Sequence, residues 1–375
     1  MVRIFHTADV HLGLKFLRQT LSDEVQRDLV SARMAVLGRM VDMAMAEQCD
    51  LLVVAGDLFD STRVPTALVR QAAEHLRRFS GIVIVLPGNH DYIESGSDSR
   101  LWPEFMEALG DRHLVLGEPR IYDLSGLDFP LVLYAAPCRS RHSKINGLGW
   151  MHEARQQDTA EHLRVAVAHG SLSGLSPDFN QEYFPMEREE LQRLRIDLWL
   201  LGHTHVRYPN VASGQEERIF FPSVPEPDGF DCQHEGYAWI IDVTFGQIPR
   251  YRSVTTGAYR FHELEFSVES EHDLDQVASQ LSKLRPDRDL VKLKLHGRLE
   301  QSLLESLHQR NEASKRLVKH IEVDASRVLQ LIQQAQIDEE FTEGSFAHRL
   351  LSELAKTEED CLALQLAHQL IVESK

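Results

Sequence analysis

The sequence is poor in cysteine: it has four among 375 residues, and no two of them form a C-x-x-C pair. This scarcity argues against a disulfide framework and against a metal site built on thiolates. Long apolar runs are also missing, because the longest candidates, residues 51–56 and 82–86, have the length of buried strands rather than the roughly 18 residues of a membrane span. The amino terminus shows no apolar signal segment. We therefore expect a folded cytoplasmic protein that does not contact membranes.

Two catalytic signatures are absent as well. No G-x-x-x-x-G-K-S/T loop is present, so the chain should not hydrolyse ATP by that mechanism. Residues 170–174 fail the G-x-S-x-G pattern of serine hydrolases, because Leu172 stands at the serine position. The balance of 40 Lys and Arg against 57 Asp and Glu gives a net charge of −17. Such a surface repels polyanions, so any contact with nucleic acid needs a local basic patch or a bound cation.

The pattern of apolar runs predicts an α/β fold. Between residues 1 and 257, short apolar runs alternate with longer amphipathic stretches, as is typical of strands that alternate with helices. Nearly every predicted strand is followed by a loop carrying Asp, Asn or His, and the carboxyl ends of such strands form a ligand-binding edge. Strands are expected at Val2–His6, Leu51–Ala55, Ile82–Leu86, Leu131–Ala135, Leu163–Ala168, Leu198–Leu201, Ile219–Phe221 and Tyr237–Val243, and helices at Ser22–Glu47, Pro65–Phe79 and Met186–Leu194.

The composition changes after residue 257. Residues 258–324 predict the order strand, helix, strand, helix, strand, and hence a smaller α/β accessory domain that caps the first. Residues 325–375 predict a helical C-terminal segment, so three domains are expected, at 1–257, 258–324 and 325–375. The apolar positions at helical spacing in this segment are Val328, Leu329 and Ile332, then Phe346, Leu350, Leu351 and Leu354, then Leu362, Leu366, Leu370 and Ile371.

Histidine is abundant, with 19 residues, and several lie in five strand-end segments. These segments offer carboxylate, imidazole and carboxamide groups but no sulfur, a set suited to Mn, Fe or Zn. In extended backbone residues i and i+2 point the same way, so D-x-H and H-x-H can each aim two side chains at one site. A single segment is compatible with an ordinary polar turn, but five in order favour a metal site. They are Asp9-Val10-His11, Gly56-Asp57, Gly88-Asn89-His90-Asp91, Ala168-His169-Gly170 and Gly202-His203-Thr204-His205.

This ordered set resembles the calcineurin-like metallophosphoesterase superfamily, whose D-x-H, G-D, G-N-H-D, H and G-H-x-H motifs cover residues 9–205 here. The resemblance implies a two-layered β-sandwich flanked by helices and a pair of divalent ions, with Asp57 bridging both. His90 would stand near the phosphate without binding metal, and Asp91 would orient it. Mn²⁺ is the expected ion, with Fe²⁺, Zn²⁺ and Mg²⁺ as alternatives. The other implied ligands are Asp9, His11 and His205 for one ion and Asn89, His169 and His203 for the second.

Three stretches are similar to the DNA repair exonuclease branch of this superfamily, the SbcD and YhaO type. They are Phe5–Gly13, Gly56–Asp60 and, in the C-terminal region, Glu343–Phe346. The similarity implies a DNA exonuclease, with single-strand endonuclease activity as an addition, that acts in DNA repair or end processing through a hydroxide bridging the two metals. It also implies an Smc-like coiled-coil ATPase subunit bound through the C-terminal helices, and it leaves a homodimer open.

Two alternatives to a nuclease remain. One is a nucleotide phosphodiesterase or phosphoprotein phosphatase with the same dinuclear core, because the metal ligands alone do not name the substrate. The other is a weakly active scaffold subunit that docks an ATPase.

A nuclease of this net charge needs local cations. Arg139, Arg141 and Lys144 lie in the window 130–151, which contains no acidic residue. Lys292 and Lys294 alternate with apolar residues and therefore share one face of a predicted strand. We expect these five side chains to contact DNA phosphates; the alternative interpretation is an ordinary solvated surface.

Overall fold

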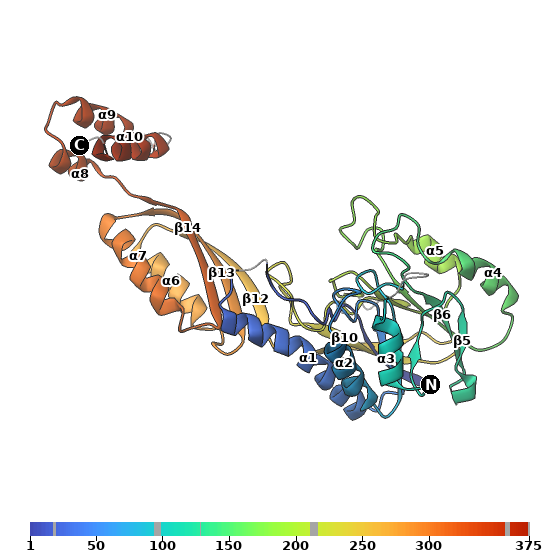
Figure 1. The fold of residues 1–375 in the computed structure, drawn as a ribbon. Helices are drawn as coiled ribbons and strands as arrows, with labels where there is room; N and C mark the ends of the chain where they lie inside the picture. Colours follow the sequence, from blue (N-terminus) through green and yellow to red (C-terminus); the bar gives the residue numbers. More distant parts are fainter. Residues whose placement is uncertain (18–19, 94–98, 128, 211–216, 357–360, 374–375) are drawn as a thin grey trace. The chain divides into compact units, whose positions relative to one another are not determined.

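The computed structural model describes residues 1–17, 20–93, 99–127, 129–210, 217–356 and 361–373 (Figure 1). It consists of two compact units, Met1–Arg260 and Phe261–Lys375. No helix among the residues described combines the length and apolarity needed to cross a membrane.

A six-stranded sheet forms one layer of the first unit. Its four strands from the N-terminal half run parallel to one another, and the two strands from the C-terminal end of the unit add antiparallel at one edge. In spatial order the strands are β11 (Arg250–Thr255), β10 (Tyr237–Val243), β1 (Val2–Thr7), β2 (Leu51–Ala55), β3 (Ile82–Leu86) and β4 (Leu114–Val115).

A five-stranded sheet forms the second layer. All strands but the first run parallel, and the first pairs antiparallel with its neighbour. In spatial order they are β5 (Ile121–Asp123), β6 (Leu131–Ala136), β7 (Leu163–His169), β8 (Leu198–Gly202) and β9 (Ile219–Phe220). A 3₁₀ turn, η1 (Ser125–Leu127), lies between β5 and β6.

The two sheets pack face to face through alternate residues of their strands. In β2, Leu51 and Val53 belong to the core between the sheets, whereas Leu52 and Val54 pack against helices on the outer face. Because both faces of the strand are covered, the strand is apolar throughout rather than alternating. The same division holds in β7, where Val165 and Val167 face the other sheet and Ala166 and Ala168 face helices.

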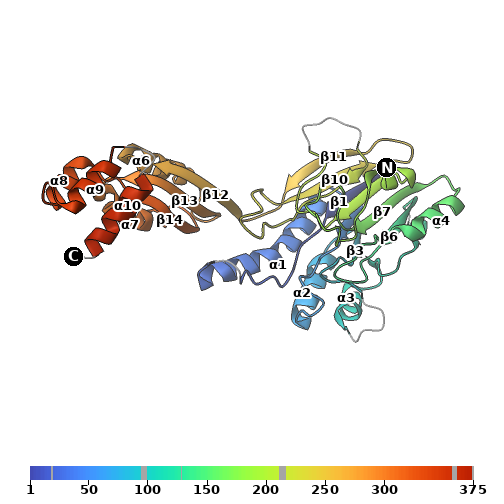
Figure 2. The same ribbon diagram turned by 90° about the horizontal axis from the view of Figure 1, so that it is seen from above.

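Helices cover the outer face of each sheet (Figure 2). On the first sheet these are α1 (Asp23–Ala46), α2 (Thr66–Arg77) and α3 (Leu101–Leu109), and on the second α4 (Gly149–Gln157) and α5 (Arg188–Arg193). Ser22 caps α1 by accepting a hydrogen bond from the Val25 amide. The expected two-layered β-sandwich flanked by helices is therefore confirmed.

Helices α3 and α4 were not predicted from the sequence, for two different reasons. Pro103 lies in the first turn of α3, a position that helices tolerate but that obscures the pattern. In α4 only Met151 is buried, so the helix has almost no apolar periodicity.

The second unit begins with a three-stranded sheet of β12 (Arg260–Val268), β13 (Asp289–Leu299) and β14 (His320–Gln330). Two helices, α6 (Glu271–Leu281) and α7 (Gln301–Ser314), share a core with these strands. Ser270 and Asp273 form a capping box at the start of α6. The expected order of strands and helices is observed, while the boundary at residue 324 stays a prediction.

One part of the sequence interpretation is wrong here. Val328 and Leu329, expected in a helix, lie in β14, where they pair in parallel with Gly297 and Arg298 of β13. Their spacing fits a helix, but a long neighbouring strand offers them backbone partners as far as Gln330, and tertiary pairing overrides the local pattern.

After β14 the described residues form three helices: α8 (Gln334–Glu340), α9 (Phe346–Leu354) and α10 (Cys361–Glu373). They enclose a small core of their own, made by Ile332, Ile337, Phe341, Leu351 and Leu364. Part of the predicted apolar pattern is not used in this core. Phe346 on α9, and Leu362, Leu366 and Leu370 on α10, are exposed.

Candidate metal centre

The five motif-bearing segments meet at one edge of the sandwich. They follow or end β1, β2, β3, β7 and β8, so they come from the carboxyl ends of parallel strands in both sheets. A cleft of about 460 Å³ opens there. The predicted ligands among its lining residues are His11, Asp57, Asn89, His203 and His205.

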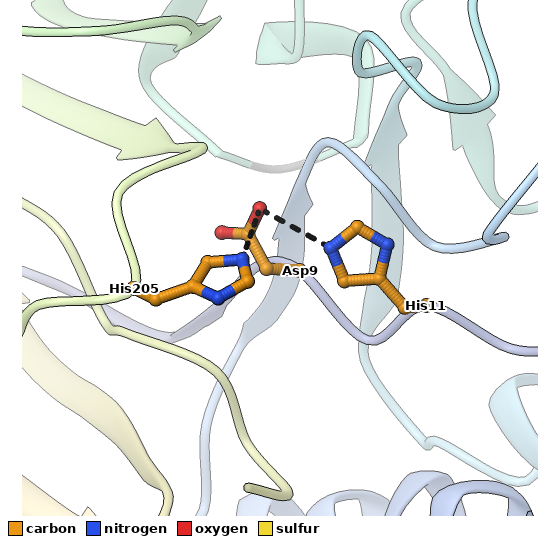
Figure 3. Close-up of side chains that lie close together, drawn as sticks. All are labelled: Asp9, His11 and His205. Atoms are coloured by element: carbon orange, nitrogen blue, oxygen red, sulfur yellow. Dashed lines mark ion pairs between the residues drawn. The ribbon is translucent and has the colours of Figure 1, made fainter. Parts of the chain in front are cut away.

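One group of side chains gathers around Asp9 (Figure 3). Its Oδ1 lies 3.9 Å from His11 Nε2 and 3.9 Å from His205 Nε2. The carboxylate is fully buried and also accepts the backbone N–H of His203. These three side chains are the set expected for the first ion.

A second group gathers around the side-chain oxygen of Asn89. Asn89 Oδ1 lies 3.0 Å from His169 Nε2 and 3.1 Å from His203 Nδ1. Asn89 Nδ2 donates to the carbonyl of Arg141 at 3.4 Å, which directs Oδ1 toward the two imidazoles. This is the set expected for the second ion.

Asp57 lies between the two groups. Its Oδ2 is 3.8 Å from His11 Nε2 and 3.3 Å from His169 Nε2, and its Oδ1 accepts the backbone N–H of His90. The position suits a bridging ligand, and the assignment of all seven ligands stays a prediction.

The donor set fits divalent cations. His169 Nδ1 lies 2.9 Å from the carbonyl oxygen of Ala55, which can only accept, so Nδ1 carries the proton in the neutral ring. The lone pair of His169 Nε2 then faces the oxygens of Asp57 and Asn89. Three lone-pair-bearing atoms that face one another out of water repel unless a proton or a cation lies between them. Carboxylate, amide and imidazole donors suit Mn²⁺, Fe²⁺ or Zn²⁺.

Asp57 and His169 shift each other's pKa values. Burial favours the neutral form of Asp57, but the neighbouring imidazoles of His169, His11 and His90 together outweigh it and hold the pKa of Asp57 far below its usual range. Burial lowers the pKa of His169, yet the charge of Asp57 and its hydrogen bond raise it to about 9. The raised pKa favours a proton on His169, and metal binding at Nε2 requires that this proton leave.

The backbone around the centre is strained. Asp9, His11, Asp57 and His203 all have positive φ angles, of 55°, 49°, 52° and 92°. Non-glycine residues rarely adopt positive φ angles, because the conformation is higher in free energy. Such strain persists where the surrounding fold fixes the backbone, often at functional sites.

Two glycines allow the loops to approach. A Cβ added to Gly56 would lie 1.9 Å from His169 Nδ1, and one added to Gly88 would lie 2.2 Å from Asp57 Oδ1. A side chain at either position would therefore push a predicted ligand out of place.

His90 lies beside the metal groups, and its partner differs from the one expected. Its ring is 4.7 Å from that of His11, and its Nδ1 contacts the carbonyl oxygen of Asp60 at 3.1 Å. The expectation that Asp91 orients His90 is corrected: the Asp91 carboxylate accepts the backbone N–H groups of Phe59 and Gly88 instead. Asp91 thus ties the two loops together, and Asp60 takes the orienting position.

Sequence reasoning missed three residues of the site. Asp60 Oδ1 lies 3.5 Å from His11 Nδ1, and Asp228 Oδ2 lies 3.5 Å from His205 Nδ1. Both carboxylates face the ring nitrogen on the far side of a predicted ligand, where such partners fix the tautomer. The ring of Tyr183 lies 4.9 Å from that of His203. Of these three residues, only Asp60 could have been found from the sequence, because it lies three positions after the predicted ligand Asp57.

The predicted DNA contacts lie in both units. Arg139, Arg141 and Lys144 follow β6 in the first unit, whereas Lys292 and Lys294 are in β13 of the second. Arg139 forms an ion pair with Glu118 at 2.8 Å, and Lys294 pairs with Glu263.

Comparison with known proteins identifies the family. Residues 2–207 match the model of the calcineurin-like phosphoesterases. The chain belongs to this family, and it is a hydrolase that carries candidate residues for a dinuclear metal site.

Individual relatives are more distant. The chain is 25% identical to the uncharacterized metallophosphoesterase YhaO of Bacillus subtilis over 65% of its own length and 58% of the relative's. It is 27% identical to the DNA double-strand break repair protein Mre11 of Methanopyrus kandleri over 60% and 49%. With the SbcD subunit of the nuclease SbcCD of Escherichia coli K12 the identity is 32% over 26% and 24%. The matched region thus spans about half the length of the first two relatives.

Solved structures with similar folds include a protein of Thermus thermophilus and a dimetal phosphatase of Danio rerio. The first has a TM-score of 0.40 at 9% identity over 68% of this chain and 99% of the other. The second has a TM-score of 0.39 at 14% identity over 68% and 99%.

The arrangement supports phosphoester hydrolysis without a covalent intermediate. Asp9, His11, Asp57, Asn89, His169, His203 and His205 would hold divalent ions, which would supply Lewis-acid activation of water and charge stabilisation at the phosphate. The contact of Nδ1 with a carbonyl leaves Nε2 of His90 as the ring atom available to the substrate, either to stabilise charge or to protonate the leaving oxygen. Burial lowers the pKa of His90, and the charge of Asp57 partly offsets this.

Replacing Asp57 should remove metal. Because Asp57 Oδ2 faces both groups, Asp57→Ala is expected to lower the metal content from about two ions per chain to fewer than one and to abolish hydrolysis of bis-para-nitrophenyl phosphate. Elemental analysis of the purified protein measures the first effect. Asp123→Ala, at the exposed end of β5, is the matched control and should keep both ions. An Asp57→Ala protein that retains two ions would show that Asp57 is not the bridge.

Replacing His90 should separate chemistry from metal binding. His90→Gln is expected to keep both ions but to reduce the turnover of bis-para-nitrophenyl phosphate by roughly 10²–10⁴, the range for a general acid or base. His90 also lies within reach of a metal shared with His11 and Asp57. Loss of an ion from His90→Gln would therefore make it a ligand, and near-normal turnover would exclude a catalytic role.

Proposed function

We propose that this chain is a cytoplasmic, manganese-dependent DNA exonuclease that acts in DNA repair or end processing. The two-metal centre would hydrolyse the phosphodiester, with the seven ligands and His90 in the roles described above. The observation that carries the DNA assignment is a pair of exposed cations, Arg141 and Lys144, on a loop whose backbone contacts the metal centre.

These cations lie in residues 139–144, which we call the basic loop. Its backbone reaches the metal centre, because the carbonyl of Arg141 accepts from Asn89 Nδ2. The side chains of Arg141 and Lys144 are exposed, and neither has an acidic partner within the part of the chain that the structure describes. On a chain of net charge −17, positive side chains on a loop whose backbone reaches the reaction centre suit an extended polyphosphate substrate.

Two relatives support this choice by name. One is called a DNA double-strand break repair protein and another a nuclease subunit. Arg139 would contribute less to DNA binding than its neighbours because Glu118 offsets its charge. Lys294 is similarly paired with Glu263, so Lys292 is the stronger candidate in β13.

A DNA assay tests the proposal. With Mn²⁺ present, the chain should degrade single-stranded and duplex oligonucleotides faster than it hydrolyses nucleotides or phosphopeptides. Binding should weaken with salt, and Arg141→Ala with Lys144→Ala should reduce the log–log salt slope by about 1 to 2, because roughly 0.7–0.9 counterions are released per phosphate contact. Arg70→Ala with Arg77→Ala, exposed on α2, is the control and should leave the slope unchanged.

The contrary result is equally specific. If the wild-type chain does not bind DNA at low salt with Mn²⁺ but hydrolyses a nucleotide or a phosphopeptide well, the chain is a phosphodiesterase or a phosphatase instead.

We also propose that an Smc-like coiled-coil ATPase binds the C-terminal helices. Leu362, Leu366 and Leu370 repeat at i, i+4 and i+8 on α10 and are 63%, 52% and 63% exposed, while Leu364 faces the core of these helices. Such a stripe suits packing against another helix, and a coiled coil provides one. A second copy of this chain is the alternative occupant.

Charge in this stripe should prevent docking. Leu366→Glu with Leu370→Glu is expected to abolish co-purification with the Smc-like ATPase of the source organism, because burying two carboxylates in an apolar contact is unfavourable. Phe245→Glu, an exposed apolar position in the first unit, should have no effect. Undiminished co-purification would place the ATPase elsewhere, and a shift from dimer to monomer in light scattering would identify a second copy as the occupant.

A further inference from the structure

Residues 176–183, which we call the wall loop, form one side of the metal cleft. Ser176, Pro177, Asp178 and Tyr183 all line it together with the predicted ligands. The ring of Tyr183 also lies 4.9 Å from that of His203, in a tilted arrangement, so the loop contacts the centre directly.

The wall loop is held in place by its own hydrogen bonds. The Asp178 carboxylate accepts from Ser171 Oγ at 2.8 Å, from the Tyr183 amide at 3.0 Å and from the Glu182 amide at 3.1 Å. Ser176 Oγ accepts from the Leu172 amide and also contacts the Thr204 hydroxyl. These hydrogen bonds hold the loop in place without a substrate. They also stabilise the negative charge of the Asp178 carboxylate.

The fixed loop presents an aromatic ring to solvent. Phe179 is 95% exposed, although a phenyl ring buried in a core would contribute about 2 kcal/mol to stability. It borders a second hollow of about 500 Å³, which adjoins the metal cleft because Ser176, Pro177 and Asp178 line both. The exposed ring of Phe179, on a hydrogen-bonded loop that adjoins the metal cleft, offers a flat apolar face to a ligand.

The wall loop is joined to the basic loop. Ser143 forms an isolated β-bridge with Tyr183, in which the Ser143 amide donates to the Glu182 carbonyl and the Phe184 amide donates to the Ser143 carbonyl, each at 2.8 Å. The cations Arg141 and Lys144 of the basic loop therefore flank the same wall. Cations that follow a phosphate backbone, next to an aromatic ring that stacks on bases, are the combination used to bind single-stranded nucleic acid.

We propose that Phe179 stacks on an unpaired base of the DNA substrate, next to the phosphate at the metal centre, while Arg141 and Lys144 hold neighbouring phosphates. The inference rests on the proposed nuclease function and specifies its substrate. Bases within a duplex already stack on their neighbours, so the exposed ring can engage only a base at a frayed end or in a single strand. Phe179 thus favours single-stranded DNA.

A comparison of normal and abasic DNA tests the inference. Wild-type protein should bind a phosphorothioate oligothymidylate, which resists hydrolysis, about 5- to 150-fold more tightly than an abasic strand of equal length, the range for one base–aromatic stack. Phe179→Ala should bind both strands equally, Phe179→Leu should lose most of the preference, and Phe179→Trp should keep it. The Kd values come from fluorescence anisotropy at one salt concentration.

Phe245→Ala removes another exposed phenyl ring and should keep the wild-type preference. A Phe179→Ala protein that still prefers the normal strand by the wild-type factor would overturn the inference while leaving the nuclease proposal in place. If the wild-type protein binds neither strand and cleaves no DNA, the proposed function itself fails, and the stacking role fails with it.

Discussion

The repulsion between buried lone pairs around Asp57 is the constraint on which the metal centre depends. The buried oxygens of Asp9, Asp57 and Asn89 converge with imidazole nitrogens at the metal cleft. Such a set is stable only when positive charge lies among its members. The sandwich holds the set together because parallel strands of both sheets end at the same edge. The positive φ angles and the tight glycines show that the loops are fixed there against their local preference.

Much of this arrangement could be predicted from the sequence. Strands such as Leu51–Ala55 and Ile82–Leu86 were predicted with their observed bounds, because a strand covered on both faces is apolar throughout. The polar residues that follow them had to meet, since the carboxyl ends of parallel strands share an edge. The division of the ligands into two sets needed the family resemblance, because spacing along the chain does not reveal distances across it.

The remainder depends on contacts between distant parts of the chain. Asp228 lies near Nδ1 of His205 only because the fold brings these two distant parts of the sequence together, and Asp228 belongs to no recognisable motif. Asp91 follows His90 directly, yet its carboxylate turns to backbone amides, so adjacency in sequence misled the assignment. In β14, pairing with a long neighbouring strand outweighed a helical pattern. The metal centre can accept any phosphoester, whereas the basic loop and the wall loop, joined through Ser143 and Tyr183, present the features that distinguish one substrate from another.

Crystallography of the Mn²⁺-soaked protein tests the central claim most directly. Anomalous difference maps should show two peaks about 3.5–4 Å apart. Asp57 should lie between them, with Asp9, His11 and His205 around one peak and Asn89, His169 and His203 around the other. A single peak, or two peaks that do not share Asp57, would contradict the two-metal centre described here.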